Sequence, residues 1–144
     1  MAKDSVEINN VFYRIPEHPV VVVCIDGSDP EYFEAASKAG VIPNIDRFMK
    51  EGFSANAHCV IPSFTCPNNI SIACGAPPKV HGISGNFYLD PETAMPVVMT
   101  GPELMRAKTI FSGLPEAGVK TVVITAKDKL RKQLGNGLDV SKGN

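Results

Sequence analysis

An unbroken run of apolar residues from Val20 to Ile25 is the strongest hydrophobic pattern in the chain. A mostly β-branched run of this length is typical of a strand buried on both faces, as in a parallel sheet covered by helices. Two further segments, 53–60 and 119–124, mix apolar and small residues in strand-like runs. The pattern therefore predicts three strands.

Helical signals separate these strands. Helix-start residues, apolar stripes and following glycines predict helices over 30–39, 43–50, 66–74, 108–117 and 127–134. Asp29 is expected to cap the first of them and Thr65 to occupy the N-cap of the third. Residues 76–102 are rich in Gly and Pro and predict a long loop with at most a short hairpin.

Strands that alternate with helices predict an α/β fold, with a mostly parallel sheet sandwiched by helices. Residues 1–18 are expected to be a short leader and residues 135–144 a polar tail. Three strands are few for a domain of this class, so we expect the chain to be a truncated part of a larger domain.

Composition narrows the function classes. The 144 residues carry 14 Lys+Arg against 15 Asp+Glu, for a formal net charge of −1. A near-neutral balance does not favour a nucleic-acid binder that works through a basic face. The apolar run at 20–25 is far shorter than the roughly 20 residues that cross a bilayer, and the polar N-terminus does not resemble a signal peptide. We therefore expect a soluble, cytoplasmic protein with no membrane partner.

The four cysteines form no Cys-x-x-Cys pair and have no histidine at zinc-finger spacing. Without a secretory signal, we expect them to be buried reduced thiols. Cys66 lies next to a candidate catalytic residue and is the cysteine most worth testing for reactivity.

Asp26 and Thr65 are the first two candidates for chemistry. Asp26 ends the first predicted strand, where ligands bind in open α/β sheets, so it suits a metal ligand; alternatively it only begins a turn with Gly27. Thr65 at a helix start suits a structural cap, or a nucleophile for phosphorus if a base or metal lowers the pKa of its hydroxyl.

Asn86, Lys127 and Lys129 complete the candidate set. Asn86 follows Gly85 and is either a turn residue or a donor to a phosphoryl oxygen. Lys127 and Lys129 come directly after the third predicted strand and either belong to a solvated helix face or hold an anionic substrate group. His81 is expected to fix its loop rather than to bind metal.

Several motifs in order carry a family resemblance. Asp26-Gly27 is followed by Pro43-Asn44-Ile45, then by the segment 62–69 with its Thr-Cys-Pro-Asn-Asn sequence, and then by His81-Gly82-Ile83. This order resembles the N-terminal half of the nucleotide pyrophosphatase/phosphodiesterase branch of the alkaline phosphatase superfamily, over about residues 20–134. The Thr-Cys-Pro-Asn-Asn segment and residues 125–129 resemble most the members that cleave a carbon–phosphorus bond.

The resemblance implies a two-zinc site and a threonine nucleophile. Asp26 would be a zinc ligand, Thr65 the nucleophile and also a zinc ligand, and Asn86 a partner of a phosphonate oxygen. Lys127 and Lys129 would meet the carboxylate of phosphonoacetate. The implied reaction is hydrolysis of the carbon–phosphorus bond to acetate and phosphate through a phosphothreonine intermediate.

The resemblance also implies that residues 1–144 are the N-terminal portion of a single alkaline-phosphatase-like catalytic domain. The remaining zinc ligands are absent from this chain, so we expect it to be inactive alone. The partner would be a small-molecule phosphonate, with a homodimer in the longer form. Two alternatives stay open: a phosphodiesterase or nucleotide pyrophosphatase of the same superfamily, and a non-catalytic anion-binding fragment.

Overall fold

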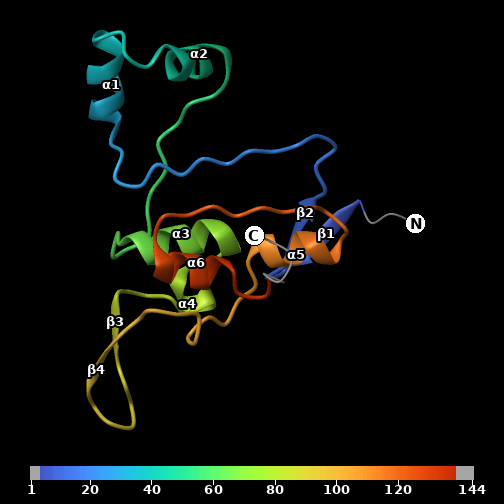
Figure 1. The fold of residues 1–144 in the computed structure, drawn as a ribbon, viewed down its shortest axis with the longest axis vertical. Coiled ribbons are helices and arrows are strands. Elements are labelled where there is room, and N and C mark those ends of the chain that lie inside the picture. The colour runs from blue at the N-terminus through green and yellow to red at the C-terminus, as the bar shows by residue number, and fades with distance from the viewer. Residues whose placement is uncertain (1–3, 139–144) are drawn as a thin grey trace. The chain divides into compact units, whose positions relative to one another are not determined.

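The computed structural model describes residues 4–138 and divides the chain into two compact units. The smaller unit spans residues 20–58, and the larger one combines the residues before 20 with those from 59 onward. Figure 1 shows the helices and strands of both units in chain order. Of the five candidate site residues, Asp26 lies in the smaller unit and the other four lie in the larger.

The smaller unit contains two helices, α1 (Pro30–Lys38) and α2 (Pro43–Glu51). Asp29 caps α1, because its side-chain oxygen accepts the backbone N–H of Glu31 at 3.0 Å. Gly40 follows α1 with a φ of +70°, and Gly52 is the C-cap of α2. Both helices confirm the prediction from capping residues.

The larger unit begins with a hairpin of β1 (Ser5–Ile8) and β2 (Val11–Arg14), in a segment for which we expected no element. Asn9 and Asn10 form its two-residue turn with φ values of 52° and 64°. A tight hairpin needs positive φ at both turn positions, which asparagine tolerates. The Asn-Asn pair between two apolar stretches was therefore the signal for this hairpin.

Four helices follow in the larger unit: α3 (Thr65–Cys74), α4 (Pro78–His81), α5 (Ile110–Glu116) and α6 (Asp128–Leu134). α3, α5 and α6 confirm predicted helices, whereas α4 lies in the predicted loop. α3 contacts each of the other three. Within residues 4–138 no helix has the length and apolar character needed to cross a membrane.

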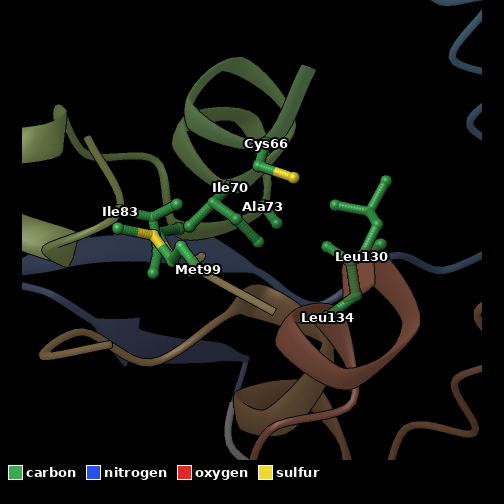
Figure 2. Packing of buried hydrophobic residues seen from close by; sticks show 8 residues of the cluster. Cys66, Ile70, Ala73, Ile83, Met99, Leu130 and Leu134 are labelled. Atoms are coloured by element: carbon green, nitrogen blue, oxygen red, sulfur yellow. The ribbon is translucent and has the colours of Figure 1, made fainter. Parts of the chain in front are cut away.

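A hydrophobic cluster holds α3 against α6. The buried members on α3 are Cys66, Ile70, Ala73 and Cys74, and those on α6 are Leu130 and Leu134. Ile83 and Met99, which flank the second hairpin, complete the cluster, and Figure 2 shows them beside Ile70, on the side away from Leu130 and Leu134. This packing sets the relative positions of the first turns of α3 and α6.

The second hairpin pairs β3 (Phe87–Leu89) with β4 (Pro96–Val98) in antiparallel register. It confirms the expectation of a short hairpin within residues 76–102. Phe87 lies opposite Val98 in the ladder, and just outside this pair the Met99 N–H donates to the carbonyl oxygen of Asn86 at 2.8 Å. The hairpin therefore fixes the backbone of a candidate site residue.

The predicted parallel sheet is not confirmed. In the described part of the chain both sheets are two-stranded and antiparallel, and the segments 20–25, 53–60 and 119–124 form no strands. Val20 to Val23 are between 68% and 85% exposed, and Ile124 is 92% exposed. A central strand needs neighbouring strands for its backbone and helices for its faces. Within residues 4–138 these exposed side chains have no such cover.

The cluster between α3 and α6 leads to a stability prediction. Ile70→Ala should lower the free energy of unfolding by about 2–5 kcal/mol, because it removes a fully buried side chain and leaves a cavity. Ile72, on the same helix, is 66% exposed, so Ile72→Ala is the matched control and should cost much less. Urea unfolding followed by circular dichroism measures both; equal losses would contradict the assigned core.

Candidate active site

We expected Thr65 at the N-cap of α3, but it is the first residue of the helix. Phe64 occupies the N-cap position. Asn68 fixes the chain that leads into the helix: its Oδ1 accepts the Val60 N–H at 2.9 Å and its Nδ2 donates to the Phe64 carbonyl at 3.0 Å. The Nδ2 group of Asn69 donates to the Thr65 carbonyl at 2.9 Å. The two asparagines of the Thr-Cys-Pro-Asn-Asn segment therefore hold the backbone on which the Thr65 hydroxyl is carried.

Lys127 meets this hydroxyl from α6. It is the N-cap residue of that helix, and its Nζ donates to the Thr65 Oγ1 at 3.1 Å across 62 positions of sequence. An ammonium beside a hydroxyl stabilises negative charge that develops on the oxygen. The pair therefore suits a nucleophile, and it joins two residues that the sequence analysis proposed separately.

A second hydrogen-bonded pair involves Lys129, two residues after Lys127. The Lys129 Nζ donates to the Asn86 Oδ1 at 2.9 Å, and both side chains are half-buried. Partial exclusion of water strengthens such a charge-assisted hydrogen bond. The structure thus gives each of the two lysines a partner among the candidate site residues.

Asp128 lies between the two lysines in sequence but pairs elsewhere. Its carboxylate accepts from the Arg131 guanidinium at 2.7 Å and lies 3.3 Å from the Lys132 ammonium. The hydrogen bond from Arg131, followed by that from Lys132, lowers the pKa of Asp128. The carboxylate is therefore ionised at neutral pH and is engaged by cations one turn further along the helix.

His81 braces the loop that carries Asn86. Its ring is fully buried, and its Nδ1 accepts the Ile83 N–H at 3.1 Å. Because Nδ1 is an acceptor, the proton is on Nε2, which donates to the Ser71 Oγ at 2.8 Å, and Ser71 in turn donates to the Pro67 carbonyl at 2.7 Å. Burial lowers the pKa of His81, and the nearby Arg106 lowers it further. These contacts agree with the expected structural role of His81, while its partner Ser71 had no signal in the sequence.

The described residues of the chain do not by themselves fit a zinc site. Zinc in proteins takes about four ligands, mostly Cys, His, Asp or Glu, and residues 4–138 contain no group of three or more such side chains that could hold a metal ion. Asp26 is exposed and lies in the smaller unit, and Thr65 is met by the Lys127 ammonium. A zinc centre needs ligands beyond those that residues 4–138 supply.

The cysteine predictions are only partly confirmed. None of the four cysteines forms a disulfide; Cys66 and Cys74 are buried, whereas Cys24 and Cys59 are exposed. Burial raises the pKa of the Cys74 thiol to about 11, so it stays protonated. Cys66, which we had singled out for reactivity, has no exposed surface and is inaccessible to reagents in this fold.

Comparison with known proteins decides the family. A model of the type I phosphodiesterase / nucleotide pyrophosphatase family matches residues 20–134, which include all five candidate site residues. The chain belongs to this family. Ectonucleotide pyrophosphatase/phosphodiesterase family member 1 from Homo sapiens is 35% identical over 75 residues, and the Rattus norvegicus protein of the same name is 33% identical over 75 residues. Each alignment covers 51% of this chain and 8% of the relative.

Two solved structures resemble this family member along almost its whole length. Both are phosphonoacetate hydrolase from Sinorhizobium meliloti 1021, one in complex with phosphonoacetate and one with phosphonoformate. The first is 48% identical with a TM-score of 0.93 and covers 99% of this chain; the second is 49% identical with a TM-score of 0.90 and covers 96%. The chain spans 35% and 33% of the lengths of those enzyme chains.

The buried histidine leads to a pH prediction for this family member. The pKa of His81 is lower in the folded chain than its ordinary value of 6.5, so the unfolded chain takes up the proton more readily. The stability contributed by neutral His81 is present above pH 6.5 and is lost as the pH falls through the lower pKa of the folded state.

Urea unfolding measured from pH 8 to pH 5 tests this linkage. His81→Gln removes the titrating ring and should flatten the pH dependence over the acidic part of that range. His58 is exposed, so His58→Gln is the matched control and should keep the wild-type dependence. An unchanged dependence in His81→Gln would show that other groups control acid stability.

Proposed function

We propose that this chain supplies the nucleophile and the substrate-binding cations of an enzyme that hydrolyses phosphonoacetate to acetate and phosphate. The observation that carries the proposal is the juxtaposition of Thr65 with Lys127 and of Asn86 with Lys129, at 3.1 Å and 2.9 Å. The identity of 48–49% to phosphonoacetate hydrolase supports the choice of substrate. Because the chain spans about a third of that enzyme, we propose that the activity belongs to a longer polypeptide.

The proposed chemistry divides into two displacements. The Thr65 hydroxyl loses its proton as Oγ1 attacks phosphorus; the oxygen–phosphorus bond forms, the carbon–phosphorus bond breaks, and the carbon takes up a proton to become acetate. Water then breaks the oxygen–phosphorus bond of the phosphothreonine, which releases phosphate and returns a proton to Oγ1. A carbon leaving group is poor, so positive charge close to its carboxylate stabilises the transition state. Lys127 and Lys129 would provide this charge, and the Asn86 amide would donate to a phosphoryl oxygen.

Thr65→Ala in the longer polypeptide should lower the rate of phosphate release from phosphonoacetate by at least about a thousandfold, because no other group replaces a lost nucleophile. Thr65→Ser keeps a hydroxyl and should retain measurable activity. Thr93 is an exposed threonine in the second hairpin, so Thr93→Ala is the control and should behave as the wild type. Normal turnover by Thr65→Ala would exclude the nucleophile assignment.

We propose further that the longer polypeptide binds zinc, with Asp26 and Thr65 as the ligands that this chain contributes. The exposed carboxylate of Asp26 at the end of the apolar run 20–25 supports this, together with the family resemblance. Asp26→Asn should lower the zinc content found by metal analysis of the purified protein. Glu34→Gln removes an exposed carboxylate of the same unit and should not; a zinc-free wild type would contradict the proposal.

The same longer polypeptide would complete the parallel sheet. The exposed apolar side chains of segments 20–25, 53–60 and 119–124 support the view that these segments become strands of one catalytic domain once neighbouring strands are present. Protection of their amides from hydrogen exchange in the longer polypeptide would report this pairing.

A homodimer of the longer polypeptide stays a prediction. The mass of the purified protein in solution tests it.

A phosphodiesterase or nucleotide pyrophosphatase is the second candidate. The family match and the names of the human and rat relatives favour it, and both candidates share the threonine. Turnover of phosphonoacetate compared with that of a phosphodiester such as bis(p-nitrophenyl) phosphate separates them. If Lys127→Ala and Lys129→Ala leave phosphonoacetate kinetics unchanged, the phosphodiester becomes the preferred substrate.

A further inference from the structure

The backbone of Asn86 is fixed, but its side-chain amide has two orientations. The Met99 N–H donates to the Asn86 carbonyl at the base of the second hairpin, and Met99 is itself buried in the hydrophobic cluster. An asparagine amide can turn by about 180° about its last torsion and so exchange its acceptor Oδ1 and its donor Nδ2. The two orientations place the Nδ2 donor on opposite sides of the amide, so only one of them suits a given acceptor.

Lys129 selects between the two orientations. An ammonium group has three donors and no acceptor, so the atom that faces it at 2.9 Å has to be the Oδ1 of Asn86. In the turned orientation two donor groups would face each other. Within residues 4–138 the Nδ2 of Asn86 makes no hydrogen bond, so the selected orientation leaves this donor for a ligand.

We propose that Lys129 is a positioning residue that orients the Asn86 amide so that its Nδ2 donates to a phosphoryl oxygen. This inference rests on the proposed function and goes beyond it, because the proposed function has Lys129 act only on the substrate carboxylate. Lys127, two residues earlier, donates to the Thr65 hydroxyl instead. The two lysines therefore contact different groups: Lys127 contacts the proposed nucleophile, and Lys129 contacts the amide that would donate to the phosphoryl oxygen.

The two roles of Lys129 predict different behaviour toward a ligand without a carboxylate. A lysine that serves only the carboxylate is indifferent to how such a ligand binds through Asn86. A lysine that orients Asn86 affects every ligand that has phosphoryl oxygens. Inorganic phosphate, the reaction product, has those oxygens and no carboxylate, so it separates the roles.

The test is a double-mutant cycle in the longer polypeptide, read as the Kd for inorganic phosphate by calorimetry. Lys129→Met and Asn86→Ala should each weaken phosphate binding by about tenfold. The double variant should be no weaker than either single variant, because the lysine acts through the asparagine. Lys129→Arg keeps a cationic donor and should recover part of the affinity.

Lys132→Met is the matched control for loss of charge. Lys132 is on the same helix and pairs with Asp128, whereas the hydrogen bond to Asn86 comes from Lys129, so the Lys132 variant should bind phosphate as the wild type does. Additive losses in the double variant would overturn the proposal, since they would show that Lys129 acts by its charge alone. Unchanged phosphate affinity in Lys129→Met, with a raised KM for phosphonoacetate, would overturn it as well and leave a carboxylate role.

Failure of the proposed function is a separate outcome. If the wild-type protein turns over no phosphonoacetate, the substrate assignment fails, yet the phosphate-binding cycle still decides whether Lys129 orients Asn86. If turnover is normal and the cycle is additive, the proposed function stands without this inference.

Discussion

The contact between α3 and α6 is the constraint on which the candidate site depends. Ile70 and Cys66 on α3 lie in one buried cluster with Leu130 and Leu134 on α6. Each helix has a candidate site residue at its N-terminus: Thr65 on α3 and Lys127 on α6. A change of one residue in the helical register would turn a side chain by about 100° around its axis. The apolar packing thus holds a polar pair together that has little affinity of its own.

The polar groups around this contact are arranged so that positive charge is retained near the hydroxyl and the amide. Asp128 could have neutralised the neighbouring lysines, but Arg131 and Lys132 engage it instead. His81 is buried and neutral, so it adds no charge and serves to connect α3 to the loop of Asn86. Lys127 is exposed, and the partly buried Lys129 is hydrogen-bonded to Asn86, which avoids the large cost of burying an unpaired ammonium.

The rest of the chain bears on how complete the catalytic domain is. The smaller unit carries Asp26, the single carboxylate with an expected role in metal binding. Long apolar side chains in the segments 20–25 and 119–124 are exposed to solvent. The chain also spans only about a third of the hydrolase structures that it resembles. The uncovered apolar segments and the partial coverage are both consistent with one part of a larger domain.

The sequence by itself determined the features that are encoded locally. Asp29 before Pro30, and glycines after the ends of the helices, were enough to place α1, α2 and α3, because a cap or a positive φ depends on a few adjacent residues. The ordered motifs were enough for the family, and they named Thr65, Asn86, Lys127 and Lys129. Thr65 still proved to be one residue inside its helix, since element boundaries depend on contacts such as those of Asn68.

Only the tertiary structure decided how the named residues are paired. Lys127 reaches Thr65 across 62 residues and Lys129 reaches Asn86 across 43, and no local pattern encodes which lysine meets which partner. The apolar runs are strand-like in composition, but a strand exists only when a neighbour supplies its hydrogen bonds. Residues 4–138 supply no such neighbours, so the same residues that predicted a parallel sheet are exposed here.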